Sequence, residues 1–351
     1  MAKIVEGADP VWELLVSGWL QSLTAEGKAQ ETLTAYGKAA VALINWMMAL
    51  PVAPSGYATP GSRRAARAAA AAAGQDRIPV YRPTGADGIT QDHIERFLVE
   101  WGSETTRLGK PRSDSAINQY FRSLQQWFAW LIADEEIDVS PMANLSPPKI
   151  GERLRPILAT DEITALIKAC QADKTIGGVR DEAIIRVLAD SGGRRSAIAG
   201  LDVDDVDIEK RLLTVISKGD REHQISVGLT TARVLNRYLR KRAAWRSGKR
   251  TGQQPVQHNG LWISWRTGAR LTPDGLYQAV QARGLEIDIR VHPHLFRHTL
   301  AHEWLDAGGG EQTLMDQMGW SSPQMLKRYG AAGRAKRAHR EHDRLGLGDR
   351  Y

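Results

Sequence analysis

The segment from His292 to Tyr329, HPHLFRHTLAHEWLDAGGGEQTLMDQMGWSSPQMLKRY, decides how the rest of the chain is interpreted. Apolar residues recur at helical spacing from Leu300, and a run of glycines at 308–310 favours a left-handed helix end there. A second helix is expected over about 311–318, and a third, short one should carry Tyr329. The pattern therefore places an imidazole, a guanidinium, an indole and a phenol near helix ends, where side chains can converge on one ligand.

These residues resemble, in their order, the C-terminal signature of the tyrosine recombinases, the phage integrase family. That signature is His-x-x-Arg-His-Thr, then Gly followed by His or Trp, then a Tyr nine residues later. The chain has the first element at 294–299, the second at Gly319-Trp320 and the third at Tyr329. A lone His-x-x-Arg pair occurs by chance in many proteins, whereas three elements in order at the family's spacing are specific.

An upstream stretch, SGGRRSAIAGL at 191–201, resembles the family's first box, Thr-Gly-Leu-Arg-Ile-Ser-Glu-Leu-x-x-Leu. The apolar anchors Ile198 and Leu201 set the frame of the comparison. In that frame Arg194 corresponds to the family's catalytic arginine, and Arg195 is the alternative.

The box departs from the family at Ala197, because an acidic residue usually stands three positions after the arginine. In the family this carboxylate holds neighbouring active-site groups in place. Its absence puts full activity in question unless Asp190 or Asp202 substitutes for it.

A β-hairpin is expected over about 212–227, because residues 213–217 and 223–227 alternate as strands around Lys218-Gly219-Asp220-Arg221. The loop resembles the family's Gly-Lys-Gly β-turn. A lysine in a turn is ordinarily just solvated, so only the surrounding boxes make Lys218 the candidate catalytic lysine.

The resemblance implies phosphoryl transfer at a DNA phosphodiester. Two guanidiniums, Arg194 and Arg297, would hold the non-bridging oxygens with their donor forks. The Tyr329 phenolate would attack phosphorus and keep the bond energy in a 3′-phosphotyrosine.

The remaining roles concern protons. A phenol with a pKa near 10 needs a base, for which the resemblance implies His294 as acid/base. Lys218 would protonate the leaving 5′-hydroxyl. Trp320 stands where many relatives have His, and its indole can donate one hydrogen bond but cannot shuttle protons. The chemistry needs no metal, cofactor or ATP, and no carboxylate-rich or His/Cys cluster suggests a metal.

Composition agrees with a nucleic-acid partner. The 351 residues have a net charge of +7, and the excess lies in residues 151–351, with 33 Lys+Arg against 24 Asp+Glu. A single cysteine, Cys170, excludes a disulfide framework and a Cys-based zinc site, and its apolar helical face indicates a core thiol. Without a long apolar segment or signal-peptide pattern, we expect a soluble, cytoplasmic, nucleoid-associated protein with no membrane partner.

The fold expected is mainly α with a small β-sheet, in the two-domain architecture of tyrosine recombinases. Hydrophobic periodicity gives two helices within about 10–50 and further helices over about 90–101, 113–132, 178–190, 230–245 and 274–283, and residues 158–163 supply the start of another. Thr160 is the expected cap of its helix, and residues 261–265 are expected as a strand. The predicted first part is a helical core-type DNA-binding domain over 1–145, with a flexible, partly Ala-rich insertion at about 51–88. A linker over 146–157 leads to a catalytic domain over 158–330. The tail over 331–351 is expected to dock in trans.

Within the helical domain, the polar start of the 113–132 helix is the candidate DNA contact, through phosphates more than bases. The aromatic stripe of the same helix reads as core. The candidate DNA-binding residues are Lys110, Arg112, Asn118 and Arg122.

The sequence thus predicts a site-specific DNA recombinase that acts as a homotetramer on double-stranded DNA with inverted-repeat core sites, through a Holliday junction. Accessory DNA-bending or directionality factors are expected partners. Two alternatives stay open: a catalytically impaired DNA-binding regulator of the same fold, supported by Ala197, and a type IB topoisomerase-like strand transferase.

Overall fold

The chain forms two units, Met1–Glu152 and Arg153–Tyr351, in a computed structural model. The boundary falls inside the stretch 146–157 that the sequence suggests as a linker. The described residues are 3–55, 63–75, 78–106, 109–149, 156–217, 221–246, 255–320, 322–324, 326 and 334–346.

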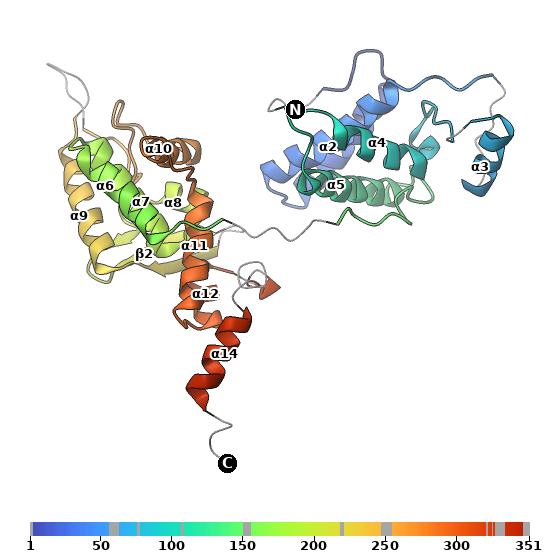
Figure 1. The fold of residues 1–351 in the computed structure, drawn as a ribbon. Coiled ribbons are helices and arrows are strands. Elements are labelled where there is room, and N and C mark those ends of the chain that lie inside the picture. Colours follow the sequence, from blue (N-terminus) through green and yellow to red (C-terminus); the bar gives the residue numbers. More distant parts are fainter. Residues whose placement is uncertain are drawn as a thin grey trace. The chain divides into compact units, whose positions relative to one another are not determined.

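Unit 1 is helical, as expected (Figure 1). Its helices are α1 (Val11–Ala25), α2 (Gln30–Met48), α3 (Arg63–Ala72), α4 (Gln91–Ser103) and α5 (Asp114–Ala133), with a 3₁₀ turn at Ala86–Gly88. Aromatic side chains fill the core, and the largest fully buried ones here are Trp12, Trp19, Phe97, Phe121, Trp127 and Phe128. The aromatic stripe of α5 is therefore core, as predicted.

Local signals set the helix ends of unit 1. Ser113 caps α5, and its Oγ accepts from the Ala116 N–H at 3.3 Å. The short Ala-rich helix expected inside the 51–88 insertion is α3.

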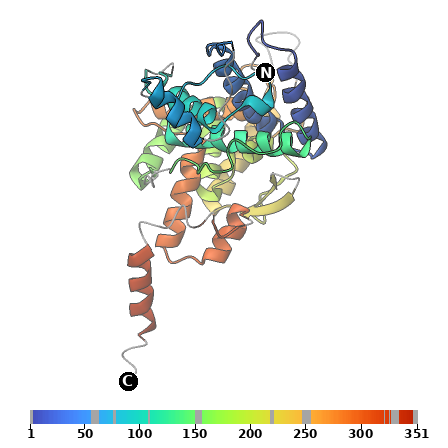
Figure 2. The same ribbon diagram turned by 90° about the vertical axis from the view of Figure 1, so that its right-hand side faces the viewer.

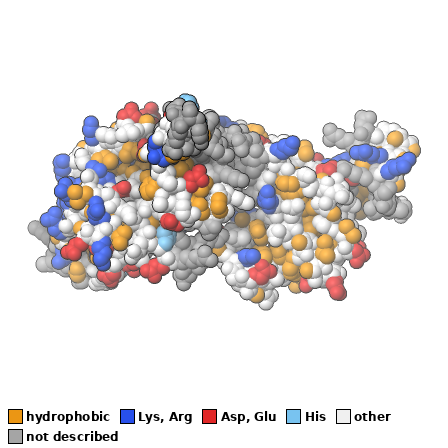
Figure 3. All heavy atoms as spheres, turned by 90° about the horizontal axis from the view of Figure 1, so that it is seen from below, with side chains coloured by type: hydrophobic (Ala, Val, Ile, Leu, Met, Phe, Trp, Pro, Cys, Tyr) orange, Lys and Arg blue, Asp and Glu red, His pale blue; other side chains and the backbone are white. Residues whose placement is uncertain are grey.

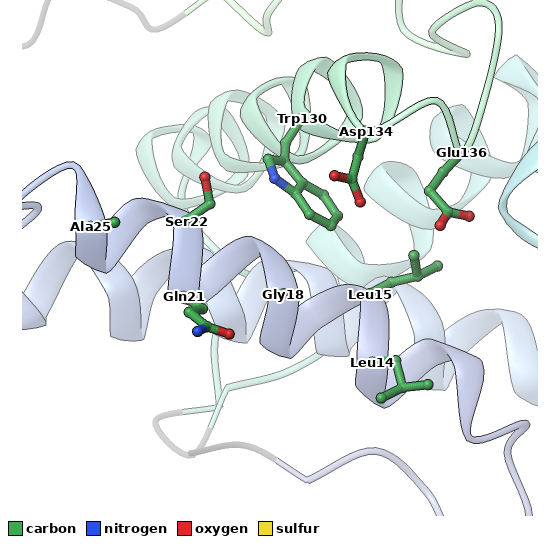
Figure 4. A pocket seen from close by; sticks show the side chains of 9 residues that line it. All are labelled: Leu14, Leu15, Gly18, Gln21, Ser22, Ala25, Trp130, Asp134 and Glu136. Atoms are coloured by element: carbon green, nitrogen blue, oxygen red, sulfur yellow. The ribbon is translucent and has the colours of Figure 1, made fainter.

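A groove of about 520 Å³ lies between α1 and α5 (Figure 4). Its lining residues are Leu14, Leu15, Gly18, Gln21, Ser22, Ala25, Trp130, Asp134 and Glu136. Two carboxylates face an apolar floor in this groove. The two carboxylates disfavour a phosphate in this groove.

Unit 2 packs helices against a small three-stranded antiparallel sheet of order β1-β2-β3. The helices are α6 (Thr160–Ala172), α7 (Ile176–Ser191), α8 (Arg195–Gly200), α9 (Leu229–Ala244), α10 (Pro273–Leu285), α11 (Pro293–Asp306), α12 (Glu311–Met318) and α14 (Arg334–Leu345). The strands are β1 (Val206–Asp207), β2 (Leu212–Ser217) and β3 (Arg221–Ser226). Twelve of the sixteen residues of α7 are buried, and the helix contacts α6, α9, α10 and α11. The central position of α7 fixes where its C-terminal end lies.

The predicted hairpin is confirmed, with Leu213 opposite Ile225 and Val215 opposite His223. Figures 1 and 2 show the hairpin beside α12, and α12 contacts β3 directly. The sheet therefore supports the end of α12.

Two local expectations were wrong. Residues 261–265 contain one isolated bridge, between Ile263 and Arg270, instead of a strand. The buried Trp262 indole donates to the Ile198 carbonyl at 2.6 Å. Packing against α8 therefore accounts for the apolar residues of the segment 261–265. Thr160 is the first residue of α6, not its cap. The Glu162 carboxylate instead accepts from the Ala159 N–H at 2.8 Å.

Cys170 is a buried free thiol, as predicted. Burial, together with the nearby Asp181 carboxylate, raises its pKa to about 12, so this thiol stays protonated at neutral pH. Across the described ranges, we find no helix with the length and apolar character needed to cross a bilayer.

Candidate active site

The C-terminal end of α7 brings the first arginine into place. Gly192 ends α7 in the left-handed conformation, with φ of 59°. A Cβ at Gly192 would lie 2.7 Å from the Met318 Sδ, so a side chain here would displace that methionine as well as strain the left-handed backbone. The buried Ser191 hydroxyl accepts from the Gly193 N–H at 3.1 Å and orders the turn. Arg194 follows as the N-cap residue of α8.

The end of α12 holds both candidate arginines. Gly319 adopts φ of 58° and stops the helix, which leaves the last carbonyls without intrahelical donors. Arg194 Nη2 donates to the Gly319 carbonyl at 3.2 Å, and Arg297 Nη2 donates to the Met318 carbonyl at 2.8 Å. Carbonyls at a helix C-terminus carry partial negative charge, so they attract guanidinium groups. Two cations from different helices thus meet on consecutive carbonyls.

Arg297 also ties the site together. Its side chain is 2% exposed, and Nη1 donates to the Gly192 carbonyl at 2.7 Å. Its guanidinium carbon lies 5.2 Å from the centre of the Trp320 ring, within the range of a cation–π contact. Arg297 therefore links the ends of α7 and α12 and lies against the predicted indole.

A residue that the sequence reading missed joins this cluster. His223 of β3 lies so close to Gly319 that a Cβ there would be 2.7 Å from its Nε2. Burial and the positive charges of Arg194 and Arg297 lower the pKa of His223. A signal existed in the sequence, because His223 alternates with the apolar Ile225 on one face of its strand.

Gln317 was also missed. Its amide accepts from the Ser226 N–H at 3.2 Å and donates to the Ser226 carbonyl at 3.0 Å. This backbone-like pairing fastens α12 to the edge of β3. No pattern in the sequence distinguishes Gln317 from an ordinary solvated glutamine.

His294 lies in the first turn of α11 and is exposed. Its ring meets that of the buried His298 edge to face, with centroids 4.4 Å apart. Thr299, the last residue of the same motif, is buried, and its Oγ1 accepts from the Leu158 N–H at 2.8 Å. The motif thus combines an outward histidine with residues that anchor α11.

The structure separates the two adjacent arginines. Arg195 donates to the Asp274 carboxylate of α10 at 3.0 Å and lies over the Tyr277 ring. Arg194 instead reaches the carbonyl of Gly319, next to Arg297. This geometry favours Arg194 over Arg195 as the partner of Arg297.

The carboxylates considered as substitutes at the Ala197 position have other contacts. Asp190 accepts from the Gly228 N–H at the start of α9. Asp202 pairs with Arg270 at 2.9 Å. Ala197 itself packs against the apolar core of unit 2. Asp190 thus caps α9, and Asp202 pairs with a surface arginine.

Lys218 and Tyr329, the candidate acid and nucleophile, lie outside the described residues. Their assignment therefore rests on the sequence. Before Lys218 the described chain ends at Ser217 in β2. Before Tyr329 it ends at Leu326, which belongs with Trp320 to a small apolar core formed by residues of α11 and α12.

The candidate DNA contacts of unit 1 have mixed surroundings. Lys110 and Arg122 are exposed. Arg112 pairs with Glu104 at 2.8 Å and lies 4.2 Å from the Trp101 ring centre. Asn118 is buried and donates to the Pro148 carbonyl at 2.9 Å. The exposed pair is better placed to meet a phosphate than the buried asparagine.

Unit 2 carries a basic surface on α9, a helix without any Asp or Glu. Figure 3 shows Lys and Arg side chains gathered at its left end, where α9 lies. The exposed cations of α9 are Arg233, Arg237, Arg240 and Lys241. Much of the positive excess predicted for residues 151–351 is therefore displayed to solvent.

Comparison with known sequences gives one family. The sequence model of the Phage integrase family matches residues 156–335. Tyrosine recombinase XerC of Myxococcus xanthus is 29% identical over 209 residues, which cover 59% of this chain and 68% of the relative. Tyrosine recombinase XerD of Listeria innocua serovar 6a is 26% identical over 243 residues, covering 68% of this chain and 78% of the relative.

Solved structures extend the likeness over both units. The XerH site-specific recombinase, in a post-cleavage complex with a palindromic difH substrate, matches with a TM-score of 0.64 and 14% identity, covering 99% of this chain and all of the other. A lambda integrase (75–356) dimer bound to a COC′ core site matches with a TM-score of 0.61 and 15% identity, covering 90% and 94%. At these identities the likeness shows the fold: two-domain, mostly helical, with a small sheet.

Proposed function

Because the chain belongs to the phage integrase family and is an enzyme of the tyrosine recombinase type, we propose that it cleaves and rejoins DNA strands through a 3′-phosphotyrosine intermediate. The observation that carries the proposal is the meeting of Arg194 and Arg297 on consecutive carbonyls at the end of α12. Two guanidiniums held side by side match the two non-bridging oxygens of a phosphodiester.

The arginines act by position and charge. A phosphodiester repels nucleophiles, and its transition state carries more charge on the oxygens. Donors already aimed at those oxygens stabilise the transition state with little reorganisation. In the free chain the carbonyls at the end of α12 already orient the Arg194 and Arg297 guanidiniums. The phosphate therefore accepts hydrogen bonds from donors that are already in position.

The proton steps follow from the assigned roles. Tyr329 loses its proton to His294 and its oxygen bonds to phosphorus, while the bond from phosphorus to the 5′-oxygen breaks. Lys218 gives the departing oxygen a proton. Rejoining runs the same steps in reverse with a 5′-hydroxyl from the partner strand. The exposed position of His294 at the start of α11 agrees with access to DNA. Trp320 supports the Arg297 guanidinium through its ring.

The assembly proposed is a homotetramer on two double-stranded sites with inverted repeats, passing through a Holliday junction. A lambda integrase tetramer bound to a Holliday junction has a related fold, with a TM-score of 0.57. Accessory DNA-bending or directionality factors, association with the nucleoid and docking of the tail in trans belong to the same proposal. The α9 cations suit the phosphate backbone.

One observation favours a second candidate, a DNA-binding regulator of the same fold. Ala197 removes the usual carboxylate, and Asp190 and Asp202 are bound elsewhere. A regulator would bind DNA with the same steep salt dependence, yet form no covalent bond to it.

A trapped covalent adduct tests the function. Duplexes enriched from a random-sequence pool by binding to the chain would be nicked near the cleaved position, so that the short fragment diffuses away. We expect a protein–DNA adduct that survives denaturing electrophoresis and is linked through the DNA 3′ end. Tight binding without an adduct would contradict the proposal and favour the regulator. Strand exchange between two duplexes, assayed in parallel, separates a recombinase from a topoisomerase-like enzyme.

Adjacent arginines provide a matched pair for the same assay. Arg194→Ala should lower the rate of adduct formation about 10²- to 10³-fold, the usual loss for one transition-state donor. Arg195→Ala removes a charge one residue away but breaks contacts with Asp274 and the Tyr277 ring on α10, so its rate should stay within about threefold of wild type by the small effect of an exposed ion pair. Equal losses in both variants would contradict the assignment.

A further inference from the structure

The side chain of His223 faces the helices of unit 2. On β3 the neighbouring Glu222 and Gln224 are exposed, whereas Ile225 and the cross-strand residue Val215 are buried. Strand alternation therefore places His223 on the covered face of the sheet. A titratable residue at such a position breaks the apolar pattern, and breaks of this kind concentrate at functional sites.

Packing of α12 brings the imidazole to the arginines. The two hydrogen bonds between Gln317 and Ser226 hold α12 on β3. Gly319 then lies so close to His223 that a Cβ on this glycine would be 2.7 Å from the His223 Nε2. The carbonyl of this same glycine accepts from Arg194. Gly319 thus links His223 to the guanidinium pair.

The electrostatic surroundings of His223 come from several elements. Burial is the main reason that the pKa of His223 is lowered, and the positive charges of Arg194 at the start of α8 and Arg297 of α11 lower it further. The buried β2 side chains on the same face are apolar, and Asp190 of α7 is bound to the Gly228 N–H. The free site therefore keeps the imidazole neutral at neutral pH. A bound phosphodiester anion would offset the two positive charges, so the part of the lowering that comes from their repulsion would fall and the pKa of His223 would rise.

On the basis of the proposed function, we propose that His223 is a further residue of the strand-cleavage site. Its imidazole takes up a proton from solvent when a phosphodiester binds between Arg194 and Arg297. The imidazolium then adds a third positive charge beside the scissile phosphate. The neutral imidazole avoids a third like charge in the free enzyme. The protonated form is favoured only with the anion in place, so the extra charge appears where negative charge develops in the reaction.

Single-turnover adduct formation on the nicked duplexes, measured across pH, tests the role. His223→Gln keeps a polar side chain of similar reach but cannot take up a proton. Its rate should fall about 10- to 100-fold, somewhat less than the usual contribution of an acid–base group, and one ionisation should vanish from the pH profile. DNA affinity at pH 8 should match wild type. Gln224→Ala, on the opposite face of the same strand, is the matched control and should keep both rate and profile.

Titration of the imidazole signals by NMR separates this proposal from the proposed function. In the wild-type chain, the pH at which His223 is half protonated should rise when DNA binds, while the signal of His258, which contacts the Gly268 carbonyl, should not change. An adduct with an unaltered His223→Gln profile, or a DNA complex with an unmoved His223 signal, would overturn the role of His223 alone. A DNA-dependent shift in a chain that forms no adduct would overturn the cleavage function and keep His223 as a phosphate-sensing group.

Discussion

Tyr329→Phe is expected to bind the enriched duplexes with the affinity of the wild-type chain and to form no covalent adduct with them. Phenylalanine keeps the ring and removes only the oxygen that would bond to phosphorus. Loss of a nucleophile of this kind lowers rates by about 10⁴- to 10⁶-fold, which puts the adduct below detection. Denaturing electrophoresis of the nicked-duplex reaction, beside an affinity measurement by anisotropy, checks both halves of the expectation.

The nearest matched control is Tyr277→Phe. That phenol lies on α10, beside the Arg195 guanidinium rather than Arg194. It should form adduct at the wild-type rate. An adduct that persists in Tyr329→Phe and disappears in another tyrosine variant would move the nucleophile elsewhere in the chain, while leaving the chemistry of strand cleavage intact.

The sequence predicted best those features that depend on local pattern. Helix periodicity, the hairpin around Lys218 and the glycine at 319 all reflect short-range sterics, and the elements lie where they were expected. Arg297 was identified through motif spacing, because the spacing of residues on consecutive helices is preserved by the fold. The box at 191–201 likewise predicted Arg194, and the contact of Arg195 with Asp274 favours that prediction.

What the sequence could not predict depends on contacts between segments far apart in the chain. His223 is 74 residues from Arg297 and becomes part of the cluster only because Gln317 fastens α12 to β3. Residues 261–265 looked like a strand because Trp262 is apolar, yet its indole binds the carbonyl of Ile198 and the segment makes one isolated bridge. Thr160 seemed a cap by residue type, but Glu162 reaches the free N–H instead. Tertiary packing decided each of these cases.

Arg297→Lys should lose both stability and activity. The lysine keeps a positive charge but replaces the planar fork by one nitrogen on a flexible stem, so it does not reproduce the separate Nη1 and Nη2 bonds to the Gly192 and Met318 carbonyls. Loss of one charge-assisted hydrogen bond in the interior costs about 1.5–3 kcal/mol of unfolding free energy. The phosphate loses a fixed donor as well, which should lower the rate of adduct formation at least about 10²- to 10³-fold. Denaturant unfolding and single-turnover assays at a temperature where the variant stays folded measure the two effects separately.

Arg242→Lys separates the structural part of this effect from the catalytic part. Arg242 of α9 also uses its guanidinium to hold backbone carbonyls, those of His258, Gly260 and Leu261. The variant should therefore lose a similar free energy of unfolding, yet form adduct at close to the wild-type rate once folded. If the two variants lose stability and rate in the same proportion, Arg297 acts only as a clamp between α7 and α12. A rate loss confined to Arg297→Lys means that the guanidinium which assembles the site also takes part in the reaction.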